Sequence, residues 1–239
     1  MTPQDSRDRY KREVEFLDYM VKCNIQNVPR IIEKNDKARK LSLEYIEGVK
    51  VEYIDDEIIE NIASFINLAN KPELAKERKQ LGEASESINT LDELHLNLEK
   101  RLDQLVNVNS KCKIISSAIN WLKKEVSNEI KKRIDKSIRS SQMKEFDIKE
   151  SQKIASPSDV GIHNTILSKN GVLYFIDFEY SGKDDLAKFA CDWIIQPEKP
   201  FNDSQESTMI DKLVTKMNHV DRDWVNRYEI IKPLLEMKW

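Results

Sequence analysis

The sequence predicts an α+β protein that is mostly helical and carries two small β-hairpins. Apolar residues recur at helical spacing over most of the chain, and two short segments are instead rich in β-branched and apolar residues. Only 5 of the 239 residues are glycine, about 2% against a usual share of roughly 7%, and no G-x-G occurs. These residues therefore contain no Rossmann turn, P-loop or glycine-rich kinase loop.

Charge and composition narrow the class of protein further. The chain has 39 Lys+Arg and 42 Asp+Glu, a net charge of -3, and 39% hydrophobic residues, which is enough for a substantial core. Its pI of about 5.8 argues against a dedicated nucleic-acid binder, which would show a basic excess. We expect no nucleic-acid partner, and the sequence leaves the oligomeric state open.

Targeting and metal signals are absent from the sequence. No apolar run approaches the roughly 18 residues of a membrane span, so we expect no membrane partner. The segment from Met1 to Arg12 is polar throughout, unlike a signal peptide. The three cysteines are odd in number and widely spaced, which suggests neither a disulfide framework nor a zinc site. A cytoplasmic location is the simplest expectation.

The first fifty residues predict a helix followed by a β-hairpin. Apolar residues repeat at helical spacing from Arg9 to Cys23. Two runs rich in β-branched residues follow, Val28 to Glu33 and Lys40 to Ile46, with Asn35-Asp36 between them. We expect these runs to pair as a hairpin that Glu47-Gly48 closes.

The middle of the chain predicts three helices. The first runs from about Asp55 to Asn70, and the second from Leu91 to Leu105 with Asn89 or Thr90 as its N-cap. The third covers roughly Lys111 to Ile138. Its heptad-like spacing permits a coiled-coil partner, but we favour a long core helix with one solvated, Lys-rich face.

The last third of the chain predicts a second hairpin and three more helices. Ser156 to Ser158 form a loop, Asn170-Gly171 a turn, and Val172 to Phe178 a strand, so this hairpin sits inside an otherwise helical region. Helices are expected at about 187–196, 206–218 and 222–237.

One polar cluster in this hairpin has a spacing that suggests a reaction. Asp159 and Asn164 are five residues apart and Asp177 follows thirteen later, in or next to the 22-residue stretch from Gly161 to Gly182 that holds three of the five glycines. A hairpin of this length brings Asp177 near Asn164, so that a carboxylate and an amide oxygen converge as magnesium requires when it also binds phosphate oxygens. Asp159 is then placed to accept a proton from an attacking hydroxyl. Singly, each of the three could be only a turn, cap or loop residue.

The segment SPSDVGIHNTILSKNGVLYFIDFEYSGKDDLAKFACDW resembles the catalytic and metal-binding core of the aminoglycoside phosphotransferase family, which is related to choline kinases and protein kinases. That family's H-x-D-x-x-x-x-N loop corresponds to Pro157 through Asn164, and the Asp of its D-F-G segment to Asp177. The resemblance implies a two-lobed, protein-kinase-like fold, ATP and Mg²⁺ as cofactors, Asp159 as catalytic base, and Asn164 and Asp177 as magnesium ligands.

Two earlier segments and one later segment support the resemblance more weakly. LSLEYIEG is similar to the hinge between kinase lobes, which implies that Glu44, Tyr45 and Ile46 bind the adenine. RYKREVEFLDYM resembles the N-lobe helix whose Glu pairs with the nucleotide-binding Lys, which implies Glu13, with Glu15 as the alternative. DDLAKFACDW resembles the helix after the metal loop, which implies that Asp185 and Asp192 brace the catalytic loop.

The sequence also departs from the family pattern. Pro157 stands where the family has a His, so the hydrogen bond that ties the catalytic loop to the metal segment must be replaced or absent. The phosphate-covering loop and the strand Lys of the N-lobe are missing from the sequence. The expected organisation is a partial N-lobe over 1–47 and a helical C-lobe over 48–239. His163 has no proton-transfer role in the pattern, and we expect it to pack in its loop.

The sequence therefore predicts an ATP-dependent phosphotransferase that transfers the γ-phosphate to a hydroxyl of a small molecule, aminoglycoside-, sugar- or choline-like. The alternative is an inactive or incomplete kinase-like module that binds a ligand.

Overall fold

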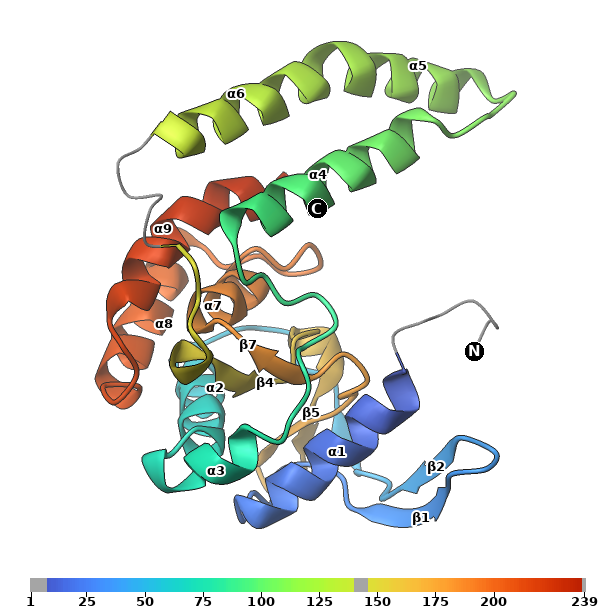
Figure 1. Ribbon diagram of the computed structural model, residues 1–239. Coiled ribbons are helices and arrows are strands. Elements are labelled where there is room, and N and C mark those ends of the chain that lie inside the picture. Colours follow the sequence, from blue (N-terminus) through green and yellow to red (C-terminus); the bar gives the residue numbers. More distant parts are fainter. Residues whose placement is uncertain (1–7, 140–145, 238–239) are drawn as a thin grey trace.

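The computed structural model describes residues 8–139 and 146–237 (Figure 1). Helices make up most of it, and the strands form three small antiparallel sheets. Helix α1 (Arg9–Lys22) and the hairpin of β1 (Ile31–Asn35) and β2 (Lys40–Leu43) lie together, and the rest of the helices gather on the other side of the central strands (Figure 1). Within the described ranges, no helix is both long and apolar enough to cross a bilayer.

The N-terminal helix and hairpin form as predicted. Asp8 caps α1 by accepting a hydrogen bond from the Lys11 N–H at 3.2 Å, and the apolar face of the helix is buried. The hairpin pairs Asn35 with Lys40 at its turn, and most of its side chains are exposed. Burial of α1, rather than of the strands, therefore anchors this part to the core.

The second predicted hairpin is also present. Strands β5 (Thr165–Ser168) and β6 (Leu173–Phe175) pair antiparallel through a turn in which Gly171 has φ 77°, a conformation that glycine adopts without strain. A third strand, β3 (Gly48–Val49), pairs with β5, so the segment after the expected hinge joins the catalytic hairpin. The division of the chain at residue 47 stays a prediction.

One pair of strands was not predicted. β4 (Ile154–Ser156) and β7 (Gly182–Asp184) flank the β5–β6 hairpin in sequence and pair antiparallel with each other. Each strand has three residues, which is too short for an alternating pattern to be seen in the sequence. Their pairing brings the start of the catalytic loop next to the segment that follows Asp177.

Four helices form the main helical core. Asp55 caps α2 (Asp56–Ala69), which packs on α8 (Asp203–Lys216). The short α7 (Leu186–Ile194) is almost wholly buried and packs on α9 (Asp223–Leu235). The smaller elements are η1 (Pro72–Leu74), α3 (Ala75–Arg78), η4 (Glu150–Gln152) and η5 (Ile162–Asn164).

The remaining helices form an outer layer (Figure 1). Thr90 caps α4 (Leu91–Val106), and the predicted third helix appears as α5 (Lys113–Trp121), a π-helical turn η2 (Leu122–Val126) and α6 (Ser127–Arg139). The expectation of a core helix is wrong for its first half, because no residue of α5 is buried. This half lies beside α4 at the periphery, and only α6 reaches the core helix α9.

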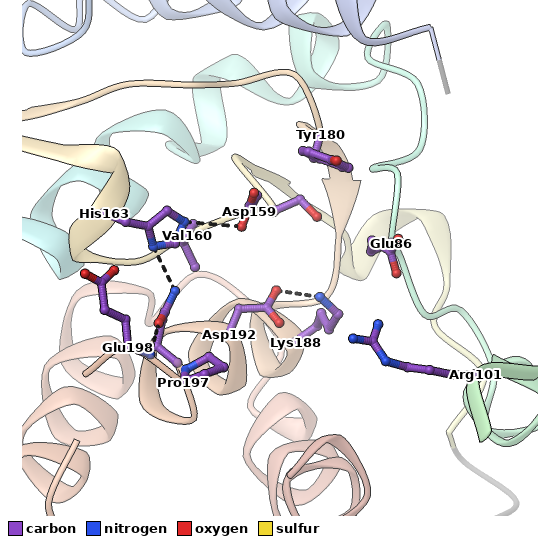
Figure 2. Close-up of a pocket in the computed structure, with 12 residues that line it drawn as sticks. Glu86, Arg101, Asp159, Val160, His163, Tyr180, Lys188, Asp192, Pro197 and Glu198 are labelled. Carbon is purple, nitrogen blue, oxygen red and sulfur yellow. Dashed lines mark hydrogen bonds and ion pairs between the residues drawn. The ribbon is translucent and has the colours of Figure 1, made fainter. Parts of the chain in front are cut away.

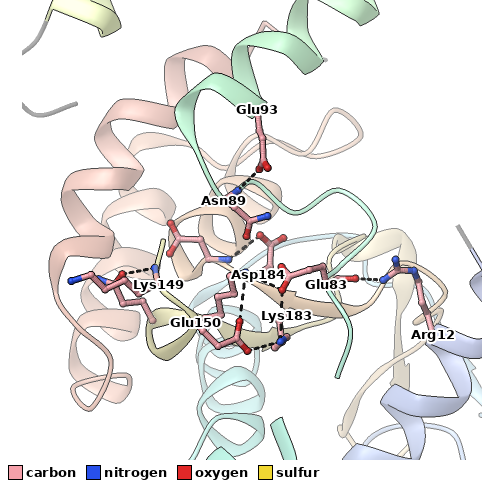
Figure 3. A network of polar contacts seen from close by, with 11 residues as sticks. Arg12, Glu83, Asn89, Glu93, Lys149, Glu150, Lys183 and Asp184 are labelled. Carbon is pink, nitrogen blue, oxygen red and sulfur yellow. Dashed lines mark hydrogen bonds and ion pairs between the residues drawn. The ribbon is translucent and has the colours of Figure 1, made fainter. Parts of the chain in front are cut away.

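A polar network ties α1 to the unpredicted strand pair (Figure 3). Arg12 of α1 donates to the carbonyl oxygen of Glu83, in the loop before α4. The Lys183 N–H of β7 donates to the carbonyl of Gly82 at 2.8 Å, and the Lys183 side chain pairs with Glu150. The loop around Glu83 thus bridges α1 and β7, on either side of the candidate site.

A buried ion pair joins α7 to α9. The Arg227 Nε and Nη2 atoms donate to the two carboxylate oxygens of Asp185 at 2.7 and 2.8 Å, and the side chains are 4% and 1% exposed. Both oxygens of Asp185 are therefore engaged by α9, and the expectation that Asp185 braces the catalytic loop is wrong. Its role is to hold the two core helices together.

Removing one partner of this pair should strongly destabilise the protein. We expect Asp185→Ala to lower the free energy of unfolding by about 3–5 kcal/mol, because Arg227 is left buried without its hydrogen-bonded ion-pair partner. Urea unfolding followed by tryptophan fluorescence measures the change. The double variant Asp185→Leu/Arg227→Met should recover most of the loss, since no charge is then buried.

The matched control is Asp18→Ala, which removes an exposed carboxylate 2.7 Å from Lys34. Its cost should stay below about 1 kcal/mol. Equal losses in Asp185→Ala and Asp18→Ala would contradict a stabilising role for the buried pair.

Candidate active site

The loop after β4 presents Asp159 to solvent through two tight backbone contacts. The Ser158 N–H donates to the Ser156 hydroxyl at 3.1 Å, and the Asp159 N–H donates to the Pro157 carbonyl at 2.9 Å. Ser158 has φ 67°, in the left-handed region, so the chain reverses direction there. The Asp159 side chain is 45% exposed as a result.

Asn164 links the catalytic loop to the strand before Asp177. Its Nδ2 atom donates to the backbone carbonyl of Asp159 at 2.9 Å, and its own carbonyl accepts the Ile176 N–H at 3.0 Å. Because the amide nitrogen is used as a donor, the side-chain oxygen is the atom of Asn164 suited to a cation.

Asp177 follows β6 with φ 64°, and its carboxylate lies near that of Asp159. Burial raises the pKa of Asp177, and the charge of Asp159 raises it further. A backbone hydrogen bond from Glu179 and the nearby His163 and Arg9 act in the opposite direction. The structure thus brings together the three residues that the sequence singled out, while their chemical roles stay predictions.

A cavity of about 330 Å³ lies on one side of this cluster and contains the other predicted site residues. Glu13, Glu44, Tyr45 and Ile46 line it together with Asp177. The remaining lining is largely apolar, from Pro29, Leu43, Ile166 and Ile176. The cavity therefore joins the expected hinge, the expected N-lobe Glu and the expected metal ligand.

The three hinge residues differ in what their backbones can offer. The Glu44 N–H donates to the Arg30 carbonyl at 2.8 Å, which continues the β1–β2 pairing. None of the backbone hydrogen bonds among the described residues involves Tyr45 or Ile46. Tyr45 and Ile46 are therefore better suited than the Glu44 N–H to bind an adenine edge.

Glu13, and not Glu15, faces the cluster. Burial raises the pKa of Glu13 to about 7, the charge of Asp177 contributes in the same direction, and a backbone hydrogen bond from Phe178 opposes them. Glu15 instead lies 3.6 Å from Lys11 on the exposed side of α1. In the part of the chain that the structure describes, no Lys or Arg forms an ion pair with Glu13.

A second cavity, of about 480 Å³, lies on the Asp159 side of the cluster (Figure 2). Asp159 and His163 border it, and α7 supplies Lys188 and Asp192, which pair at 2.5 Å although Lys188 is only 3% exposed. Asp192 lies one turn after Lys188, so the pair is local to α7.

The charged residues Glu86 and Arg101 of this cavity were not predicted from the sequence. Glu86 comes from the loop before α4 and Arg101 from α4 itself, and Figure 2 shows both on the same side as Lys188. Neither belongs to a motif, and both lie far from the catalytic hairpin in sequence. Only the tertiary fold brings them to the cavity, so the sequence carried no signal for them.

The described residues contain no group of three or more His, Cys, Asp or Glu side chains that could hold a metal ion alone. Magnesium commonly binds through one or two protein oxygens together with substrate phosphates. The pair formed by Asn164 and Asp177 has this chemistry.

Comparison with known proteins gives no match by sequence. No family model matches the chain. No curated protein matches it either.

Solved structures, in contrast, match over nearly the whole chain. A choline kinase from Cryptosporidium parvum is similar with a TM-score of 0.62 and 14% identity, over 100% of this chain and 71% of that protein. An ethanolamine kinase from Plasmodium vivax matches with a TM-score of 0.60 and 16% identity, over 99% and 66%. An aminoglycoside phosphotransferase from Streptomyces rimosus, solved with ADP and streptomycin, matches with a TM-score of 0.54 and 14% identity, over 100% and 85%. The chain therefore has the protein-kinase-like α+β fold of the choline kinase and aminoglycoside phosphotransferase structures, as the sequence predicted.

Proposed function

We propose that this protein transfers the γ-phosphate of ATP to a hydroxyl group of a small molecule. The observation that carries the proposal is the position of Asp159, Asn164 and Asp177 between two cavities. Asp177 borders the cavity with the hinge residues, and Asp159 borders the second cavity. A phosphoryl donor in the first and a hydroxyl acceptor in the second would meet at these residues.

In the proposed reaction the acceptor hydroxyl loses its proton to the Asp159 carboxylate as its oxygen attacks the γ-phosphorus. The bond from that phosphorus to the bridging oxygen breaks, and ADP leaves. Catalysis of this kind depends mainly on positioning and charge neutralisation. Asp159 suits the base because its backbone is fixed by two loop contacts and its side chain remains accessible.

Asn164 and Asp177 are the proposed magnesium ligands. They offer one amide oxygen and one carboxylate, a donor set that fits Mg²⁺ shared with phosphate oxygens. The raised pKa of Asp177 also fits, because a carboxylate that is partly buried and lies near the charge of Asp159 is stabilised by a nearby cation. When bound, Mg²⁺ neutralises negative charge on the transferring phosphate.

The comparisons support the cofactor and the acceptor class. The matching structures include a choline kinase and an ethanolamine kinase, and the aminoglycoside phosphotransferase was solved with ADP. Each of these names points to a phosphoryl transfer onto a small hydroxylated molecule. The charged lining of the second cavity suits a polar acceptor of this kind.

The second candidate function is a kinase-like module that binds a ligand without turnover. The absence of G-x-G from the 239 residues favours it, because backbone N–H groups of a glycine-rich loop normally cover the phosphates. Binding and turnover measurements separate the two candidates.

Calorimetry with Mg-ATP should show binding to the wild-type chain, and a coupled assay with a panel of amino alcohols, aminoglycosides and sugars should show ADP formation. Asp159→Ala should lower turnover at least about 100-fold with little change in ATP affinity, because it removes only the base. Asp177→Ala should lower both, because it removes a proposed metal ligand.

Asp211→Ala, an exposed Asp→Ala change on α8, is the matched control and should leave both quantities unchanged. Mg-ATP binding without turnover on any acceptor would favour the binding module. A folded wild-type protein that binds no Mg-ATP would refute both the enzyme and the ATP-binding assignment.

Glu13 predicts a pH dependence of stability. Its pKa is about 7 in the folded protein against an ordinary 4.5, so between these values the folded state keeps a proton that the unfolded state releases. The free energy of unfolding should therefore fall as the pH rises from about 4.5 to about 7. After allowance for solvent screening of this half-buried group, the loss should be about 1–2 kcal/mol.

Glu13→Gln should remove this slope and make the protein more stable than wild type at alkaline pH, as measured by urea unfolding in EDTA. Glu15→Gln is the matched control on the same helix, and it should shift stability by less than about 0.5 kcal/mol. Identical pH profiles for wild type and Glu13→Gln would show that Glu13 is not protonated in this window.

A further inference from the structure

Three contacts connect the end of α7 to Asp159 across the second cavity (Figure 2). The Glu198 N–H donates to Gln196 Oε1 at 2.9 Å, and Gln196 Nε2 lies 2.8 Å from His163 Nδ1. His163 Nε2 then lies 3.6 Å from Asp159 Oδ1. The four residues all line the same cavity.

The first contact fixes the orientation of the Gln196 amide. A backbone N–H can only donate, so the Gln196 atom that faces Glu198 must be the oxygen. The other end of the amide, which faces His163, is therefore the NH₂ group, and it can only donate.

The second contact then fixes the tautomer of His163. Because Gln196 donates to Nδ1, that ring nitrogen must carry a lone pair, and the proton of the neutral ring lies on Nε2. The Nε2–H group is the one that faces the Asp159 carboxylate. A chain of directional contacts thus aims a donor at one oxygen of Asp159.

Gly161 makes this arrangement possible. A Cβ atom at position 161 would lie 2.5 Å from Gln196 Nε2 and 2.6 Å from His163 Nδ1, directly at the bond between them. Such distances are too short for any side chain. The glycine in the loop therefore leaves the space in which Gln196 meets His163.

We propose that His163 is a positioning residue for Asp159, held in its Nε2–H form by Gln196. This inference rests on the proposed function. The Nε2–H donor orients Oδ1 of the carboxylate, which leaves Oδ2 to accept the proton of the acceptor hydroxyl. At 3.6 Å the contact is slightly longer than a hydrogen bond, and catalytic contacts of this kind often shorten when the substrate is bound.

The tautomer can be measured without any assumption about activity. The chain has three histidines, so the ring ¹⁵N resonances of His163 are assigned by comparing wild type with His163→Gln. In alkaline solution, where histidine is neutral, we expect the Nε2–H pattern in the wild type. An Nδ1–H pattern would overturn the proposal.

Gln196→Glu reverses the second contact with almost no change in shape. A carboxylate at position 196 still accepts the Glu198 N–H, but it can only accept from His163, so in alkaline solution, where the ring is neutral, the ring proton moves to Nδ1. The Nε2 lone pair then faces Asp159. In that alkaline solution we expect kcat to fall about 10- to 100-fold with the KM for ATP unchanged, because a wrong tautomer misplaces the base but not the nucleotide.

Two further variants separate positioning from loop packing. His163→Gln retains a donor on the Asp159 side and should keep more activity than His163→Leu, although both alter packing. Gln26→Glu, the same chemical change at an exposed position beside Asn24, should leave kcat, the KM for ATP and the ring ¹⁵N shifts unchanged.

The outcomes distinguish failure of this inference from failure of the proposed function. An active wild type whose kcat is unaffected by Gln196→Glu overturns the positioning role and leaves the phosphotransferase intact. A wild type without turnover removes the proposed function, and the ¹⁵N shifts then decide the contact alone, with Nε2–H supporting it and Nδ1–H overturning it.

Discussion

Asn164 holds two carboxylates near one another, and the rest of the site depends on this constraint. Its side chain binds the backbone of Asp159, and its carbonyl binds the strand that leads into Asp177. Burial raises the pKa of Asp177, and the like charge of Asp159 raises it further, so both disfavour a charged carboxylate at this position. The folded protein tolerates the repulsion because the β5–β6 and β4–β7 pairs fix both segments independently of the carboxylates. A cation bound beside Asp159 and Asp177 would offset this negative charge.

The same constraint explains the role of the surrounding scaffold. The core helices α7 and α9 are joined by the buried pair of Asp185 and Arg227, and α7 carries Lys188, which lines the second cavity. Helix α1 places Glu13 near Asp177. A hydrogen bond from Arg12 to the Glu83 carbonyl links that helix to the loop before α4. Elements from both ends of the chain thus meet at one hairpin.

The sequence predicted those parts of the fold and site that depend on local patterns. Helices α1, α2 and α4 have clear apolar periodicity and end within one or two residues of their expected bounds, and the spacing of Asp159, Asn164 and Asp177 indicated one cluster. The β4–β7 pair could not be predicted, because three-residue strands show no period. The prediction that α5 lies in the core was wrong. An apolar stripe predicts burial, whereas α5 lies at the periphery of the fold.

The lining of the second cavity could not be predicted from sequence motifs. Glu86 and Arg101 reach it through tertiary packing alone, and His163, for which only loop packing was expected, is oriented by Gln196 more than thirty residues away. One part of this contact is visible in the sequence, namely Gly161. A Cβ atom at this position would collide with both Gln196 and His163. Gly161 therefore meets a geometric requirement of the contact between Gln196 and His163.

Binding of a metal–nucleotide complex at Asn164 and Asp177 is tested most directly by locating the bound metal. Mn²⁺ can replace Mg²⁺ with ATP, and its unpaired electrons broaden nearby backbone amide resonances in NMR spectra. If these residues bind the metal, the amides of Asn164 and Asp177 broaden first, before those at the distant β1–β2 turn. Asp177→Ala then abolishes the broadening. Selective broadening elsewhere in the chain, or broadening at Asn164 that survives Asp177→Ala, would contradict metal binding at these residues.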